Sequence, residues 1–255
     1  MAALLEAKNV TMQFGGLKAV DSVDMVINEG EIRALIGPNG AGKTTLFNVI
    51  SGIYIPTDGN VLLEGKDITK LRPHQVTAQG IARTFQNLQL FDQLSALDNV
   101  MVGRHIHVKS GTISTFLHTP KMKREENNCR DKSLEMLEFV GMSNYVSTIA
   151  SGLPYGRKRV LEIARALASE PKIIMLDEPC AGMNPTEKEE LMELIVKIRD
   201  SGVTVLLVEH NMRVAMGVSD YVTVLDYGRK ICEDVPEVVQ KDPQVIEAYL
   251  GREED

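Results

Sequence analysis

Gly37-Pro38-Asn39-Gly40-Ala41-Gly42-Lys43-Thr44 is the stretch that decides how this chain folds. It matches the pattern G-x-x-x-x-G-K-[ST], follows the apolar run Ile32–Ile36 and precedes a helical pattern, Thr44–Ser51. Glycines let successive backbone N–H groups curve around a phosphate, and the positive end of a helix adds attraction. The stretch therefore predicts a phosphate-binding loop between a buried strand and a helix. A glycine-rich turn that matches by chance is the alternative, and the flanking strand and helix argue against it.

Two residues of this loop have expected roles beyond backbone contacts. Lys43 would reach the β- and γ-phosphates of a nucleoside triphosphate, and the Thr44 hydroxyl would bind Mg²⁺. The complete set expected to hold the nucleotide phosphates is Gly37, Pro38, Asn39, Gly40, Ala41, Gly42, Lys43, Thr44 and Thr45.

A pair of acidic residues follows a second apolar run. Lys172–Leu176 reads as a strand, and Asp177 and Glu178 come directly after it. A carboxylate at the carboxyl end of a buried parallel strand faces the ligand crevice. Asp177 is placed to hold Mg²⁺ through water, and Glu178 to polarise an attacking water. The alternative, a solvated pair at a strand end, is weakened by the phosphate loop.

Strand and helix patterns alternate along the chain. Val203–Val208, like Ile32–Ile36 and Ile173–Leu176, is typical of a strand buried on both faces of a parallel sheet. Asn184–Ser201 reads as a helix that begins with a capping box between Asn184 and Glu187. This alternation predicts an α/β fold with a largely parallel sheet.

The remaining segments give coarser predictions. Antiparallel strands are expected near Met1–Val26, and a strand, turn and second strand over Tyr221–Cys232. Arg104–Asn128 is polar and reads as an inserted loop that leads into a helix from about Cys129 to Val140. A short helix, Pro243–Leu250, is expected last.

Composition excludes several classes of protein. The 255 residues are 44% hydrophobic and 25% charged, which suits one large globular α/β domain. The net charge of −7 makes nucleic acid a poor partner. Three widely spaced cysteines favour neither a disulfide framework nor a zinc site. We expect no signal peptide at Met1–Val10, and no apolar run approaches the ~18 residues that a membrane span needs.

Four further elements occur in a fixed order with the phosphate loop and the acidic pair. Together they form a pattern that extends over nearly the whole chain and resembles one known family. They are Phe14, Gln86, a segment before the helical pattern Lys158–Ala168, and His210. That segment is Leu153-Pro154-Tyr155-Gly156-Arg157, and it is called the signature segment below. Together the elements resemble the ATP-binding-cassette ATPases. Taken singly they are weak, because Phe14 could be a core residue, Gln86 a surface amide and His210 a strand-end histidine.

The resemblance implies a phosphate-loop NTPase with a mostly parallel core sheet, an antiparallel β subdomain and an α-helical signature subdomain. Residues 1–255 would form a single ATP-binding domain, with the helical subdomain at about 92–160 and the polar insert at about 104–128. ATP and Mg²⁺ are the implied cofactors.

The resemblance also implies roles for single residues. Phe14 would stack on adenine, and Glu178, His210 and Gln86 would be catalytic. Mg²⁺ would be held by Thr44, Gln86 and Asp177. Gln86 would also connect the site to a transmembrane partner. The signature segment would act in trans, closing over the γ-phosphate of ATP bound to a second ATPase subunit.

The signature segment departs from the family pattern L-S-G-G-Q. Pro154 replaces the serine whose hydroxyl contacts the γ-phosphate, and Arg157 replaces the glutamine. Gly156 and the helix after it could still form an anion site. Asn184 stands where the family usually has aspartate. An unusual signature favours a different partner chain, so a heterodimer is expected, with a homodimer as the alternative.

Further matches point to one branch of the family. They are Gly15-Gly16-Leu17-Lys18-Ala19-Val20, Arg83-Thr84-Phe85-Gln86, Glu178-Pro179-Cys180-Ala181-Gly182-Met183-Asn184-Pro185 and Ala248-Tyr249-Leu250-Gly251. They resemble ATP-binding subunits of bacterial branched-chain amino-acid importers. The implied partners are two transmembrane permease subunits, a second ATPase subunit and, indirectly, a solute-binding protein, with the chain peripheral on the cytoplasmic face of the inner membrane.

Several alternatives remain open on sequence alone. The transported solute could be urea or another solute, or the chain could serve lipopolysaccharide export, although that ATPase usually keeps a fuller signature. A soluble cassette ATPase of DNA repair or translation usually has two cassettes or a long coiled coil. A metabolic phosphate-loop kinase would lack both the helix that follows the signature segment and a histidine in the place of His210.

Overall fold

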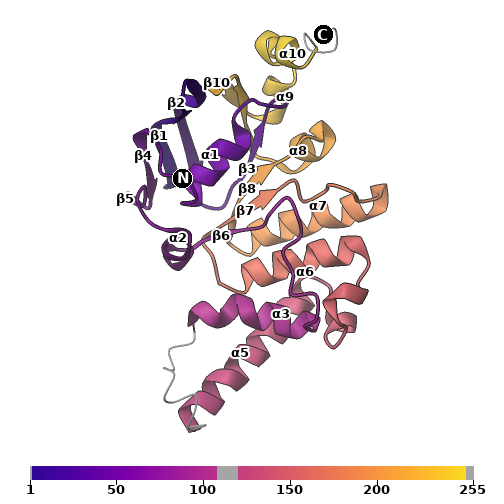
Figure 1. Ribbon diagram of the computed structural model, residues 1–255. Coiled ribbons are helices and arrows are strands. Elements are labelled where there is room, and N and C mark those ends of the chain that lie inside the picture. The colour runs from indigo at the N-terminus through magenta and orange to yellow at the C-terminus, as the bar shows by residue number, and fades with distance from the viewer. Residues whose placement is uncertain (1, 108–119, 251–255) are drawn as a thin grey trace.

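The structure, a computed structural model, describes residues 2–107 and 120–250. Figure 1 shows a small β-sheet beside the amino-terminus, a larger sheet in the middle and a helical lobe at the other end of the molecule. Among the described residues no helix is both long and apolar enough to cross a bilayer.

The small sheet is antiparallel and has the strand order β2-β1-β4-β5. Its strands are β1 (Ala3–Phe14), β2 (Leu17–Asn28), β4 (Asp58–Leu63) and β5 (Lys66–Asp67). Buried apolar side chains of β1 and β2 pack against helix α1 (Lys43–Ile50) and the large sheet. The antiparallel strands expected near Met1–Val26 are therefore present, and α1 is covered by both sheets.

The large sheet has the order β10-β9-β3-β8-β7-β6. All neighbours pair in parallel except β10, which is antiparallel to β9 at one edge. The strands are β3 (Ile32–Ile36), β6 (Ile81–Arg83), β7 (Ile173–Asp177), β8 (Thr204–Val208), β9 (Tyr221–Asp226) and β10 (Arg229–Asp234). Every residue of β3, β7 and β8 is buried. This confirms the predicted α/β fold with a mainly parallel sheet.

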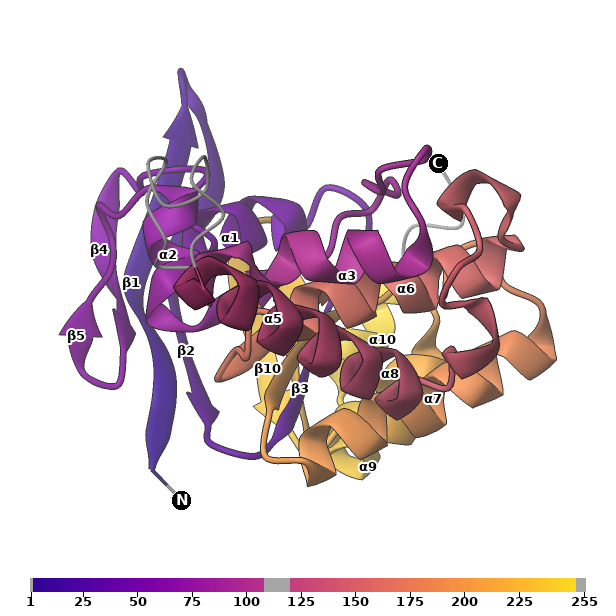
Figure 2. The same ribbon diagram turned by 90° about the horizontal axis from the view of Figure 1, so that it is seen from below.

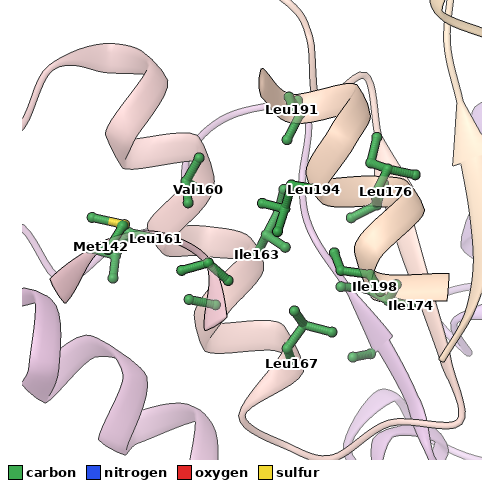
Figure 3. Packing of buried hydrophobic residues seen from close by; sticks show 14 of the residues in the cluster. Met142, Val160, Leu161, Ile163, Leu167, Ile174, Leu176, Leu191, Leu194 and Ile198 are labelled. Carbon is green, nitrogen blue, oxygen red and sulfur yellow. The ribbon is translucent and has the colours of Figure 1, made fainter. Parts of the chain in front are cut away.

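Helices pack on both sides of this sheet and extend beyond it. They are α2 (Pro73–Gln79), α3 (Ala96–Gly103), α5 (Pro120–Phe139), α6 (Tyr155–Leu167), α7 (Pro185–Asp200), α8 (Met212–Val218), α9 (Pro236–Val239) and α10 (Pro243–Leu250). Helices α3, α5 and α6 form the helical lobe, which lies side by side with α7 in Figures 1 and 2. Figure 3 shows apolar side chains of α6 directed toward those of α7 and β7, so one core joins the lobe to the sheet.

The predicted loop over Arg104–Asn128 is wrong in its last third. Helix α5 begins at Pro120, nine residues before the predicted start near Cys129. Proline is favoured in the first turn, and the Lys, Arg and Glu residues that follow form helices well even without an apolar face. Arg104–His107 form a 3₁₀ turn, and residues 108–119 lie outside the described residues.

Candidate nucleotide-binding and catalytic site

The predicted phosphate loop lies between β3 and α1, and its neighbours determine its shape. Gly37 and Gly42 have φ values of 151° and 97°. A Cβ atom at Gly37 would lie 2.1 Å from the carbonyl oxygen of Leu225, and one at Gly42 would lie 2.3 Å from that of Ala19. Glycine is therefore required at both positions, because backbone groups on two sides leave no space for a side chain.

Lys43 folds back over this loop. Its Nζ donates hydrogen bonds to the carbonyl oxygens of Gly37, at 2.7 Å, and Pro38, at 2.9 Å, and the residue is 5% exposed. No side chain of the described residues caps α1 at Gly42, so its first N–H groups can meet an anion. Thr44 is exposed in the first turn. A cation, backbone donors and a hydroxyl thus converge where a nucleotide's phosphates and metal would bind.

Asp177 ends β7 and is held by Arg83, the last residue of β6. Arg83 Nη2 lies 3.0 Å from Asp177 Oδ2, and its Nη1 donates to Asn48 Oδ1 at 2.6 Å and Ser51 Oγ at 2.8 Å. Burial raises the pKa of Asp177, and the charge of Arg83 acts in the opposite direction. Arg83 therefore fixes Asp177 against the end of α1. In the sequence, Arg83 stood out only as part of a match to one branch of the family, and nothing there indicated this role.

The predicted metal ligands have the right donor chemistry. The hydroxyl of Thr44, the amide of Gln86 and the carboxylate of Asp177 supply oxygen atoms, which Mg²⁺ prefers while it keeps several waters. The roles of these three residues stay predictions.

Glu178, His210 and Gln86 form one hydrogen-bonded cluster. Glu178 Oε1 lies 2.8 Å from His210 Nε2, and Gln86 Nε2 donates to Glu178 Oε2 at 3.3 Å. The three residues follow β7, β8 and β6, which are neighbours in the sheet, so their loops meet at one edge. Glu178 is held with a φ of 46°, and its N–H donates to Val208 O at 2.9 Å. His210 and Gln86 thus orient the carboxylate of Glu178, whose side chain remains 18% exposed.

Phe14 lies at the end of β1 and is 44% exposed, so it is a surface aromatic and not a core residue. Its ring meets that of Tyr54 edge-on, with centroids 5.4 Å apart. An exposed ring of this kind can stack on a planar base. Its role with adenine stays a prediction.

The signature segment surrounds the start of α6. Pro154 precedes the helix, and no side chain of the described residues caps it. Tyr155 packs against Gly182, whose Cβ position lies 3.1 Å from its ring, and Arg157 Nη2 lies 3.2 Å from Glu190 Oε2 on α7. Leu153 is buried and Gly156 packs against Glu187. Side chains of the segment are thus engaged with α7 and the loop before it, while the backbone at the helix start stays open.

Two buried charged residues on α6 were missed by sequence reasoning. Arg159 and Glu162 form an ion pair of 3.1 Å with side chains 3% and 2% exposed. A third missed residue, Glu209, is 4% exposed and accepts hydrogen bonds from the N–H groups of Cys180, at 3.0 Å, and Asn211, at 3.4 Å. Glu209 therefore joins the loops that carry Glu178 and His210. A charged residue on an otherwise apolar helix face was the available signal for Glu162.

The fold and the site together place the chain in the class of ATP-binding cassette ATPases. A family model described as "ABC transporter" matches residues 20–181, and one described as "Branched-chain amino acid ATP-binding cassette transporter" matches residues 229–255. The high-affinity branched-chain amino acid transport ATP-binding proteins BraF of Pseudomonas aeruginosa and LivG of Escherichia coli K12 are 41% and 42% identical to it, over 97% of this chain and 98% of each relative. The chain belongs to this family of branched-chain amino acid transport ATP-binding proteins and is an ATPase.

Two solved structures support the same assignment. The ADP conformation of the ATP-binding cassette MJ1267 is 32% identical and has a TM-score of 0.86, covering 99% of this chain and 100% of that one. The dimeric post-hydrolysis state of the cassette MJ0796, bound to ADP and Pi, is 27% identical with a TM-score of 0.76, covering 91% and 99%. Both neighbours have the fold described here.

Proposed function

We propose that this chain is the ATP-hydrolysing subunit of a membrane importer for branched-chain amino acids. The observation that carries the chemistry is the position of Glu178 between His210 and Gln86, at the same sheet edge as the phosphate loop. The identity of the transported solute is supported by the similarity to BraF and LivG, whose names state it.

In this proposal the chain's own residues hold and activate ATP. Lys43 and the N–H groups of the loop bind phosphate oxygens, and Phe14 stacks on the base. Thr44, Gln86 and Asp177 would hold Mg²⁺, which would neutralise charge on the phosphates. Glu178 accepts a proton from the attacking water, and His210, hydrogen-bonded to Glu178, orients that carboxylate and contacts the γ-phosphate. Catalysis thus rests on positioning and charge stabilisation.

A second ATPase subunit completes each site in this proposal. The open start of α6 provides backbone donors for a γ-phosphate bound on the partner, and MJ0796 shows that a similar cassette dimerises. Pro154 supplies neither a hydroxyl nor an N–H, so we propose a partner chain with a different signature. ATP then holds two subunits together, and its hydrolysis lets them separate.

A groove at Gln89, three residues after Gln86, suits a permease contact. It has a volume of about 410 Å³ and is lined by Gln89, Phe91, Val102 and Arg165, among others. Phe91 and Val102 are exposed, at 49% and 42%, and Arg165 offers a charge beside them. We propose that a cytoplasmic segment of a permease docks here, which places the chain peripherally on the cytoplasmic face of the inner membrane. Opening of the ATPase pair would then be passed to the permease next to Gln86.

Purification of tagged Glu178→Gln protein from its native membranes with Mg-ATP tests this function. The variant keeps the carboxylate's shape but cannot accept a proton, so it should bind ATP normally while kcat falls by about 10²–10⁴-fold. Glu193→Gln, on the exposed side of α7, is the matched control and should hydrolyse normally.

Mass spectrometry of the captured proteins distinguishes the alternatives. Two permeases, a second ATPase subunit and a solute-binding protein would support the importer and supply the receptor for a leucine-binding assay. Capture of ribosomal or DNA-processing factors without membrane proteins would refute it. A receptor that binds urea in preference to leucine would correct the solute.

A further inference from the structure

Helix α6 presents two different faces to the rest of the protein. Apolar side chains such as Leu161 and Ile163 face α7, β7 and the remainder of the helical lobe, as Figure 3 shows. The buried pair Arg159 and Glu162 instead meets the segment after β6, which contains Gln86. This segment runs over residues 84–90 and belongs to neither a strand nor a helix.

The pair bonds the backbone on both sides of Gln86. Arg159 Nη1 donates to the carbonyl oxygen of Phe85 at 2.7 Å, and its Nη2 donates to that of Gln86. Glu162 Oε1 accepts from the N–H groups of Phe85 and Gln89, each at 3.4 Å. Four backbone groups of one short segment thus depend on a single pair of side chains.

A contribution to folding stability alone does not explain this arrangement well. Replacing a buried ion pair by apolar residues of similar size is often neutral or stabilising for folding, and α6 already has an extensive apolar face. The guanidinium fork of Arg159 reaches two successive carbonyl groups, which is a geometric task that a point charge performs poorly. The hydrogen bonds of the pair are therefore directed at the conformation of the segment that carries Gln86.

We infer that Arg159 and Glu162 are positioning residues that make Gln86 and α6 move as one body. This inference rests on the proposed function, in which Gln86 acts at this subunit's own nucleotide site and the start of α6 acts at the partner's site. The pair then links the two sites within one chain. A movement of Gln86 on binding or losing the γ-phosphate is passed to the signature segment through Arg159, which lies only a few residues from Pro154.

Two variants with different risks test the inference in the full-length chain. Arg159→Lys keeps the charge but loses the fork. The double variant Arg159→Met/Glu162→Leu removes the pair and leaves no unpaired buried charge, so it avoids the largest cost of removing one partner alone. Both should lower kcat by about 10–100-fold, because small misplacements of catalytic groups have effects of this size. The Kd for ATP on the isolated chain should stay unchanged, since the phosphate loop lies before α1.

Arg104→Gln is the matched control. Arg104 is also a buried arginine of the helical lobe, and its Nη1 donates to Ala168 O at the other end of α6, at 3.4 Å, and to Glu170 Oε1 at 2.9 Å. Among the described residues it forms no hydrogen bond or ion pair with residues 84–90. This variant should lower Tm without changing kcat.

The decisive measurement combines these variants with Gln86→Ala. If Arg159 acts through Gln86, the double variant Arg159→Lys/Gln86→Ala should have the kcat of Gln86→Ala alone. The inference would be overturned if the fold-losses in kcat of Arg159→Lys and Gln86→Ala multiplied in the double variant. It would also be overturned if kcat were unchanged in both Arg159→Lys and Arg159→Met/Glu162→Leu. A fully active Gln86→Ala would instead refute the proposed catalytic role of Gln86.

Discussion

Helices α1 and α6 begin differently from α3 and α7. No side chain of the described residues caps α1 after Gly42 or α6 after Pro154. Helices α3 and α7 have the N-cap residues Ser95 and Asn184, whose side-chain oxygens accept hydrogen bonds from the N–H groups of the first turn. A cap uses donors that an anion would otherwise meet. The comparison separates helix ends that are closed by a side chain from the two helix ends that we predict to bind phosphate.

The two open ends are themselves built differently. The loop before α1 owes its shape to the backbone, because Gly37 and Gly42 fit against carbonyl groups of β9 and β2. The start of α6 is held by side chains, through the contacts of Tyr155 with Gly182 and of Arg157 with Glu190. The first site is therefore shaped by backbone groups of both sheets, while the second depends on α7 and on the loop before it.

Matched glycine substitutions should give the largest difference between these two ends. In Gly42→Ala the new Cβ would lie 2.3 Å from a backbone carbonyl, at a φ of 97°, so we expect loss of ATP binding. In Gly156→Ala the Cβ would meet Glu187 Oε1 at 2.6 Å, and that flexible side chain can move. ATP binding should survive there, with lower turnover. Calorimetric titration with ATP and circular dichroism would measure binding and folding, and equal losses of affinity would contradict the comparison.

Removing the cation beside each open end should have a smaller effect. Lys43→Ala should raise the Kd for ATP on the isolated chain by about 10–100-fold, because a hydrogen bond to a charged group contributes roughly 1.5–3 kcal/mol. Arg157→Ala should leave this Kd unchanged, since Arg157 lies on the signature segment, away from the phosphate loop, and is engaged by Glu190 of α7. Fluorescence titration with a labelled ATP analogue would compare them. An unchanged Kd in Lys43→Ala would remove Lys43 from the site.

The sequence predicted the parallel core well for a physical reason. Strands buried on both faces are continuous apolar runs, and β3 was predicted with the bounds that the structure has. The start of α5 was missed because an exposed polar helix lacks apolar periodicity, so only intrinsic propensity marks it. Periodicity reports burial, and it is therefore silent where a helix is solvated.

The site was predictable in its residue types but not in its connections. Glu178, His210 and Gln86 are bonded together because β6, β7 and β8 are neighbours, and strand order cannot be derived from one sequence. Arg159 and Glu162 were missed because charged residues are usually exposed, and only the fold shows that they are buried. Local patterns thus gave the phosphate loop, while contacts between distant segments needed the structure.

Giving α6 a cap would sharpen the comparison. Pro154→Ser places a hydroxyl at the cap position, where it can accept from the first-turn N–H groups, so the free energy of unfolding should rise by about 0.5–1 kcal/mol. When ATP is bound on a partner, the hydroxyl can turn from the cap to the γ-phosphate, as the resemblance implies for the family's serine, so the Glu178→Gln background should homodimerise more tightly with ATP. Urea denaturation and sedimentation velocity would measure the two effects. A tight homodimer already present with Pro154 would contradict the proposed need for a different partner.

Removing the cap of α7 should change folding stability alone and have no effect on the nucleotide site. Asn184 Oδ1 accepts from Glu187 N at 3.0 Å, and Glu187 Oε2 accepts in return from Asn184 N at 3.0 Å. Asn184→Ala should lower the free energy of unfolding by about 1 kcal/mol, and Asn184→Asp, which keeps the acceptor, should restore it. ATP affinity of the isolated chain should be equal in both variants. A loss of affinity in Asn184→Ala alone would show that the open helix ends and the capped ones are not separate in function, because the cap would then also shape the site.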